Sequence, residues 1–125
     1  MGVKAHYNPM IPAEDLTISQ WEVYDSLMDY NLSVTDALQS LLHWMKKNGL
    51  EKLVSKTQIL IAPGYSFKII NGLITNFHQP QSTLLLLVAA LIGKDWKSVY
   101  DYALENDFRF LSYGDGCFLK LKSQK

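Results

Sequence analysis

The sequence predicts an α/β or α+β fold, in which a mixed sheet containing a β-hairpin packs against about three helices. Three observations support this fold class. Apolar residues recur at helical spacing over residues 34–45, β-prone runs follow over residues 56–77, and a wholly apolar segment covers residues 84–92. Since both kinds of pattern occur within 125 residues, we expect one mixed domain or part of one.

The first twenty residues differ from the rest of the chain. They show little periodicity and contain Pro9 and Pro12, so we expect residues 1–20 to form an extended N-terminal arm. Residues 21–125 are then expected to form a single α/β domain. Where the two meet, residues 18–24 alternate apolar and polar side chains, which predicts a short strand.

The clearest helix begins after Ser33, a good N-cap with Asp36 in the capping-box position. Asn48-Gly49 is expected to end it, because glycine adopts the left-handed C-terminal conformation without steric cost. One face of this helix carries the apolar residues expected to point inward, which are Val34, Leu38, Leu41, Leu42 and Met45.

Several strands are predicted next. Residues 56–62 end in an unbroken apolar run, which is typical of a strand covered on both faces. Residues 66–70 and 72–77 are β-prone and meet at Asn71-Gly72, a strong hairpin signal. The hairpin would deliver the polar residues Thr75 to His78 to its far end.

The remaining elements follow Pro80. Ser82 or Thr83 could cap a helix over residues 84–92 that is apolar on every face and must therefore be surrounded by protein. In so short a chain this indicates a missing partner or a dimer. After Gly93, Asp95 is expected to cap a further helix. Its inward positions would be Val99, Tyr102 and Ala103, and residues 108–111 and 117–121 would form closing strands.

Composition and charge restrict the class of protein. Cys117 is the single cysteine, which excludes an internal disulfide and fits a reducing compartment. The longest apolar run is shorter than the roughly 20 residues of a membrane span, and the N-terminus lacks the apolar core of a signal peptide. We therefore expect a soluble, cytoplasmic chain without a membrane partner. A net charge of zero counts against a free-standing nucleic-acid binder.

Two polar groups flank the apolar segment at residues 84–92. His78 lies at a strand-to-helix junction, where an imidazole suits proton transfer near neutral pH or simply fixes the junction through hydrogen bonds. The backbone N–H groups at Ser82 and Thr83 could bind a carboxylate or phosphate, or could serve only as an ordinary cap.

A second polar stretch covers residues 109–115. Arg109 is the only arginine; it could hold an anion bidentately, or it could pair with a carboxylate such as Asp115. Tyr113-Gly114 could approach a ligand closely, although Gly-Asp-Gly is also ordinary turn chemistry. Cys117 fits a small core residue better than a nucleophile. The histidines at positions 6, 43 and 78 are scattered, so no metal site is expected.

The two polar stretches together resemble the C-terminal signature of the S-adenosylmethionine:tRNA ribosyltransferase-isomerases of queuosine biosynthesis. The first string is Thr75-Asn76-Phe77-His78 with Pro80 and Ser82-Thr83-Leu84, and the second is Arg109-Phe110 with Ser112 to Asp115. Residues 61–65, Ile-Ala-Pro-Gly-Tyr, are similar to a strand and turn of the same family. The two strings in order are more specific than either alone.

This resemblance implies an activity. Members of the family transfer the ribosyl part of S-adenosylmethionine to 7-aminomethyl-7-deazaguanine at the tRNA wobble position and isomerise it to epoxyqueuosine. S-adenosylmethionine is then a substrate, tRNA a partner, and no metal is implied. The catalytic residues implied are His78 for proton transfer, Arg109 as an anion clamp, and Asp115. Substrate binding is expected from a surrounding set, namely Thr75, Asn76, Ser82, Thr83, Tyr113 and Gly114.

Length is the main departure from the family. Family members are several times longer, so the chain resembles a C-terminal fragment of their larger α/β domain, with its N-terminal portion as a missing partner. Activity of this chain alone is therefore left open. The alternative is a non-catalytic assembly or dimerisation domain that keeps the fold, and a third hypothesis is a small domain that binds methionine or phosphate at Arg109 and Ser82.

Overall fold

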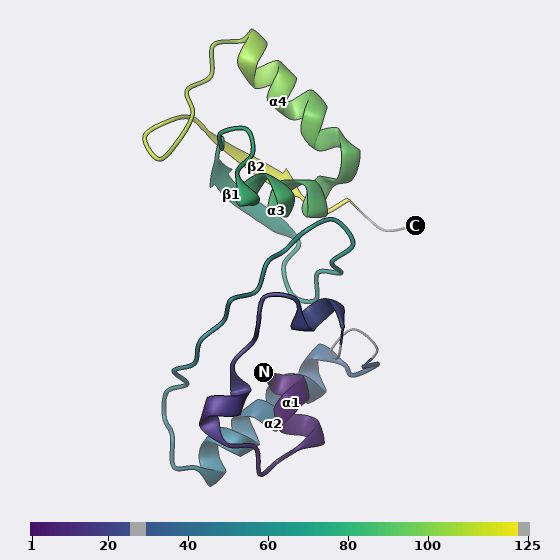
Figure 1. The fold of residues 1–125 in the computed structure, drawn as a ribbon, viewed down its shortest axis with the longest axis vertical. Helices are drawn as coiled ribbons and strands as arrows, with labels where there is room; N and C mark the ends of the chain where they lie inside the picture. The colour runs from purple at the N-terminus through teal and green to yellow at the C-terminus, as the bar shows by residue number, and fades with distance from the viewer. Residues whose placement is uncertain (26–29, 123–125) are drawn as a thin grey trace. The chain divides into compact units, whose positions relative to one another are not determined.

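The structure is a computed structural model that describes residues 1–25 and 30–122. Contacts between residues divide the chain into two compact units, residues 1–59 and residues 60–125, and each is described by itself (Figure 1). The prediction that residues 21–125 act as a single domain stays a prediction. Among the described residues, no helix has both the length and the apolar character needed to cross a membrane.

The first unit is built on two packed helices, α1 (Gly2–Tyr7) and α2 (Val34–Lys47). Gly2 allows close packing, because a Cβ there would lie 2.4 Å from the carbonyl oxygen of Ala37 in α2. Two 3-10 turns follow α1, η1 (Ala13–Leu16) and η2 (Glu22–Tyr24). Residues 1–20 thus differ from the predicted extended arm, since they contribute a helix and the buried side chains of Ala5 and Leu16.

The ends of α2 confirm the local signals in its sequence. The Ser33 hydroxyl accepts the N–H of Asp36 at 3.0 Å, and Gly49 follows the helix with φ of 67°. The predicted inward face is wrong in part. Trp44 is the buried residue of α2, whereas three residues of the predicted face are exposed: Val34, Leu38 and Leu42. The reason is that α1 and η1 approach the side of the helix that carries Trp44, whose indole N–H donates to the carbonyl of Ile11 at 2.8 Å.

The strands predicted over residues 18–24 and 56–62 are absent as regular elements. Only an isolated parallel bridge joins Ile18 to Thr57. It rests on two backbone hydrogen bonds, from Ile18 N–H to the Lys56 carbonyl and from Gln58 N–H to the Ile18 carbonyl. Alternation and apolar runs show which faces a segment could bury, but a strand also needs a neighbour along its length. In the described structure these segments meet at a single position.

The second unit contains a two-stranded antiparallel sheet of β1 (Gly72–Asn76) and β2 (Gly116–Lys120), so the prediction of helices combined with strands is confirmed. Gly72 faces Lys120, and Asn76 faces Gly116. The partner predicted for β1 was wrong, because residues 66–70 form no strand and β2 takes that place. Residues 108–111 also form no strand, since their backbone bonds go to other segments.

Two helices pack with this sheet. α3 (Thr83–Ile92) begins at the Ser82 cap and ends at Gly93, which has φ of 64°. A 3-10 turn, η3 (Gly93–Asp95), leads into α4 (Trp96–Glu105). Two details of α4 differ from the prediction. The Asp95 side chain makes no cap bond and instead pairs with Lys122 at 2.8 Å, and Tyr100 rather than Tyr102 points inward.

Phe77 is the centre of the core of this unit. Its ring contacts those of Tyr100, Phe108 and Phe110 at centroid distances of 5.3, 5.6 and 5.5 Å. The other buried members come from α3, α4 and β2: Val88, Leu91, Ile92, Ala103 and Leu119. The core therefore holds in place the residues on both sides of the polar stretches that the sequence singled out.

Candidate functional site

The first polar stretch lies where β1 ends. Thr75 Oγ1 lies 2.8 Å from His78 Nε2, so the threonine orients the imidazole. The backbone N–H of His78 donates to the hydroxyl of Tyr100 at 3.1 Å. His78 lies two residues beyond Asn76, the end of β1, and its N–H makes no bond in the ladder with β2, so the Tyr100 hydroxyl satisfies this half-buried backbone donor. The ring and the backbone of His78 are thus held by two separate partners.

The second polar stretch is a closed loop over residues 109–115. The Asp115 carboxylate accepts the backbone N–H of Arg109 at 2.6 Å, and the Asp115 N–H donates to the Arg109 carbonyl at 2.8 Å. Within the loop, Gly114 N–H donates to the Leu111 carbonyl at 2.8 Å. Position 114 requires glycine, because a Cβ there would lie 2.4 Å from the Arg109 carbonyl oxygen.

The two stretches lie against each other. Leu111 N–H donates to the Phe77 carbonyl at 2.9 Å, and Phe77 N–H donates to the Asp115 carbonyl at 3.3 Å. The amide of Asn76 donates to the Gly114 carbonyl at 3.2 Å, across 38 positions of sequence. These bonds fix the loop beside His78, so the described structure brings together most of the predicted site residues.

Ser82 and Thr83 stand at the start of α3. The Ser82 hydroxyl accepts the N–H of Leu84 at 3.2 Å, and the Ser82 N–H donates to the Gln79 carbonyl at 3.3 Å. These are the bonds of an N-cap, which is the plainer of the two roles that the sequence allowed. A role for the pair in anion binding stays a prediction.

Arg109 and Asp115 form the charged part of the site. The guanidinium Nη2 lies 3.6 Å from Asp115 Oδ1, so the pairing considered from the sequence is present, although the contact is long and exposed. The hydrogen bond from the Arg109 backbone N–H, helped by the guanidinium charge, lowers the pKa of Asp115. Asp115 is therefore ionised at neutral pH. The guanidinium keeps donors available for an incoming anion.

Cys117 and Tyr100 are each hydrogen-bonded to the first polar stretch. The thiol of Cys117 is 3.5 Å from the Thr75 carbonyl, and burial raises its pKa, which disfavours the thiolate and supports a packing role. Burial also raises the pKa of Tyr100, so its hydroxyl stays protonated. Sequence reasoning missed Tyr100, yet its spacing from Trp96 and Ala103 on α4 is the helical signal that could have found it.

No group of three or more His, Cys, Asp or Glu side chains within the described ranges could hold a metal ion.

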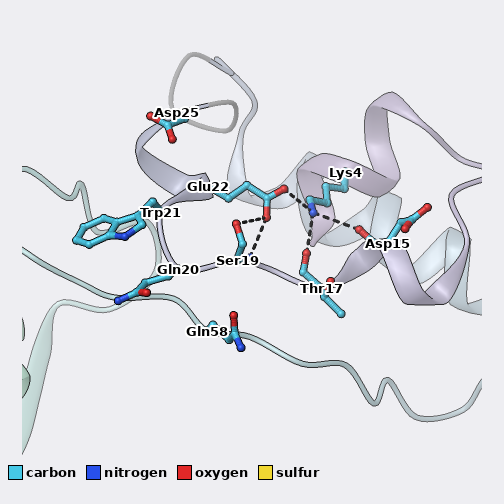
Figure 2. A pocket seen from close by; sticks show the side chains of 9 residues that line it. All are labelled: Lys4, Asp15, Thr17, Ser19, Gln20, Trp21, Glu22, Asp25 and Gln58. Carbon is cyan, nitrogen blue, oxygen red and sulfur yellow. Dashed lines mark hydrogen bonds and ion pairs between the residues drawn. The ribbon is translucent and has the colours of Figure 1, made fainter.

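The first unit contains an open cavity of about 760 Å³ that the sequence did not predict. Its central contact is the Lys4 ammonium, which pairs with Glu22 at 2.6 Å and donates to the carbonyls of Thr17 and Asp15 at 2.7 and 3.2 Å (Figure 2). The cavity is lined by Lys4, Asp15, Thr17, Ser19, Gln20, Trp21, Glu22, Asp25 and Gln58. Because the structure already satisfies the lysine with three acceptors, this cluster acts as a brace between α1 and the turns that follow.

Comparison with known proteins identifies the family. The family model described as "Queuosine biosynthesis protein" matches residues 32–119, and the chain belongs to that family. The match includes both polar stretches and the core around Phe77.

Similar curated proteins carry one name, S-adenosylmethionine:tRNA ribosyltransferase-isomerase. The protein from Halothermothrix orenii is 49% identical over 88 residues, which cover 70% of this chain and 25% of that protein. The protein from Geotalea uraniireducens is 46% identical over 87 residues, or 68% of this chain and 25% of that one. The chain thus spans about a quarter of the length of these relatives.

A solved structure is also similar. It is the crystal structure of S-adenosylmethionine tRNA ribosyltransferase from Thermotoga maritima. The TM-score is 0.49 and the identity 31%, and the similarity covers 66% of this chain and 37% of that one.

Proposed function

We propose that the chain is the C-terminal part of an S-adenosylmethionine:tRNA ribosyltransferase-isomerase. It would act with S-adenosylmethionine as a substrate and without a metal. The reaction transfers and isomerises the ribosyl group onto 7-aminomethyl-7-deazaguanine at the tRNA wobble position, giving epoxyqueuosine. The observation that carries the proposal is the direct bonding of the 109–115 loop to Asn76 and Phe77, beside His78. Family membership supports the same reading.

His78 is the proposed proton-transfer group. The contact with Thr75 occupies Nε2, so Nδ1 is the ring nitrogen proposed to exchange a proton with a substrate. A sulfonium acidifies the C–H bonds next to it, so a positioned base can begin the rearrangement. Thr75 and the Tyr100 hydroxyl hold this base in one orientation, which is the condition for efficient proton transfer.

Arg109 is the proposed anion clamp, with Asp115 as its support. The Asp115 carboxylate closes the loop on the Arg109 backbone and keeps the guanidinium at the loop edge. That group suits the methionine carboxylate or a tRNA phosphate. Substrate positioning is assigned to a surrounding set, which is Thr75, Asn76, Ser82, Thr83, Tyr113 and Gly114.

The proposed partners follow from the relatives. They are tRNA and the upstream portion that makes up the remainder of the longer relatives. The place of action is the cytoplasm, where this tRNA modification would occur.

A transfer assay tests the proposal. Label from S-adenosylmethionine would be followed into tRNA carrying the deazaguanine precursor, with the chain alone and with the chain co-expressed with the upstream three quarters of the Halothermothrix orenii relative. Transfer in the mixture that is lost in His78→Ala and Arg109→Ala supports the assignment. A co-purifying but inactive mixture would overturn it.

A second candidate function is a non-catalytic assembly domain that forms a homodimer. It is favoured by Ile74 and Phe118, which face each other across the sheet and are 81% and 61% exposed. Such apolar exposure is a recognised mark of an interaction surface. Sedimentation equilibrium decides this alternative: a dimer that Ile74→Ser dissociates supports it, and a monomer at all concentrations eliminates it.

A further inference from the structure

The 109–115 loop displays two side chains to solvent. Tyr113 is 98% exposed, and the side chain of Arg109 is 76% exposed. Single exposed residues are common on protein surfaces, but an almost fully exposed aromatic ring on the loop that carries the only arginine needs a reason.

The exposure is built into a closed loop. Both ends are tied together by the two hydrogen bonds between Arg109 and Asp115, and the middle is tied to Phe77 through Leu111 N–H. Leu111 has φ of 70°, a left-handed conformation that is costly for a bulky residue. Backbone strain of this kind is found where the surrounding structure imposes it and is concentrated at functional sites. The bonds and the strain hold the loop in one shape with Tyr113 outside the core.

We propose that this loop contacts single-stranded RNA, with an unpaired base stacked on Tyr113 and the adjacent phosphate bound by Arg109. The inference rests on the proposed function and names the part of the chain that meets the RNA. Aromatic rings that receive unstacked bases, combined with arginine, are the usual means of binding single-stranded nucleic acid. The chain neighbours of Tyr113, which are Ser112 and Gly114, are small, so they leave both faces of the Tyr113 ring open.

The geometry favours RNA over a small ligand. Pockets for small molecules enclose most of the ligand surface, whereas a ring that is 98% exposed offers open faces and no enclosing walls. The cavity around Lys4 and a smaller one that His6, Ser40 and His43 help to line both lie among residues 1–59, so Tyr113 lines neither of them. An RNA strand can use such a single platform because its remaining contacts lie elsewhere along the strand.

Electrostatics agrees with this assignment. Asp115 is the acid that pairs with Arg109, and its Oδ2 accepts the Arg109 backbone N–H while its Oδ1 lies 3.6 Å from the guanidinium. The guanidinium therefore has donors left for a phosphate, which it can bind bidentately. Asp107, two residues before Arg109, is exposed and on the approach to the loop, so the field at this edge is mixed and binding is expected to be modest.

The test uses the 125-residue chain and a fluorescein-labelled RNA hairpin with a single-stranded loop, followed by fluorescence anisotropy at low salt. Tyr113→Ala is expected to weaken binding by about tenfold, the effect of losing one stacked base. Tyr113→Phe keeps the ring and should bind as the wild type does. Tyr102→Ala is the matched control, because Tyr102 is an exposed tyrosine of the same unit outside the loop. Arg109→Ala should weaken binding and reduce the salt dependence by about one charge.

Several outcomes would overturn the proposal. They are equal binding by Tyr113→Ala and the wild type, equal losses in Tyr113→Ala and Tyr102→Ala, and no hairpin binding by the wild-type chain. If Tyr113→Ala loses S-adenosylmethionine binding, measured by calorimetry, and keeps RNA binding, the ring would instead be assigned to the small substrate. RNA binding that depends on Tyr113 without ribosyl transfer in any assembly would leave this inference standing and remove the proposed function.

Discussion

Gly114 offers the sharpest structural test of the site. Replacement by alanine puts a Cβ 2.4 Å from the Arg109 carbonyl oxygen and 2.6 Å from the backbone carbons of Arg109 and Phe110. Backbone atoms on the far side of a closed loop cannot move away without opening it. Three hydrogen bonds depend on the loop staying closed: Gly114 N–H to Leu111, Asp115 N–H to Arg109, and Asn76 to the Gly114 carbonyl.

The magnitude follows from those bonds. At about 1 kcal/mol each, their loss lowers the free energy of unfolding by about 3 kcal/mol. For a chain of this size the midpoint of thermal unfolding falls by roughly 10 °C. Gly116→Ala is the matched control, because its Cβ would lie 3.6 Å from the Thr75 carbonyl oxygen, an ordinary contact. Thermal unfolding followed by circular dichroism compares the two. Equal midpoints for the variants would refute the closed geometry of the loop.

Three further predictions follow from named contacts. The Asp115 carboxyl should titrate below its ordinary pKa of 3.8 when followed by carbon NMR. Its contribution to stability is therefore complete above pH 3.8 and is lost as pH falls through the lower pKa of the folded state. A titration at or above 3.8 would mean that the folded state lacks the hydrogen bond from the Arg109 N–H. Cys117 should react with iodoacetamide at about pH 8 more slowly than a free cysteine, because burial raises the pKa of its thiol. The rate of this reaction should increase in urea, which exposes the thiol. A rate in the folded state equal to that of free cysteine would contradict this prediction. Lys4→Met should lower the free energy of unfolding by about 1–3 kcal/mol, because it leaves Glu22 and two carbonyls without their donor. Burial raises the pKa of Glu22, but the hydrogen bonds from Lys4 and Ser19 and the charge of Lys4 together outweigh it and lower the pKa. The share of the destabilisation that comes from the Lys4–Glu22 pair should therefore be full above the ordinary pKa of 4.5 and fade as pH falls through the lowered value. A destabilisation that stays constant in acid would exclude the pair as a cause.

Helix ends were predictable from the sequence because they depend on neighbours in the chain. Ser33 and Ser82 cap α2 and α3 as expected, and Gly49 and Gly93 follow the two helices with positive φ. Each signal involves residues within one turn, so one sequence suffices to find it.

Strand pairing was not predictable in the same way. Asn71-Gly72 is a hairpin signal, yet β1 pairs with the distant Gly116–Lys120 segment. β1 pairs with β2 rather than with the segment across the turn, because the apolar residues of β2 complete the core, where Leu119 is buried in the same cluster as Phe77. A tertiary choice of this kind leaves no mark at the turn itself.

The candidate site was predictable as a set of residues but not as a structure. Polar residues at element ends identified Thr75 to His78 and Arg109 to Asp115. The bonds that join them are mostly made by backbone groups of Phe77, Leu111 and Asp115, which carry no side-chain signal. The support that Tyr100 gives to the His78 backbone was missed, because Tyr102 was expected to face inward with Val99 and Ala103, whereas the structure buries Tyr100.

A chimeric enzyme would test most directly whether this chain can supply the matching segment of an active ribosyltransferase-isomerase. Residues 32–119 would replace the matching segment of the Halothermothrix orenii relative, and transfer from labelled S-adenosylmethionine to precursor tRNA would be measured. We predict transfer by the chimera, its loss in the same chimera with Arg109→Ala, and its retention with Lys97→Ala as a surface control. A folded chimera that binds tRNA but transfers nothing would contradict the proposed function.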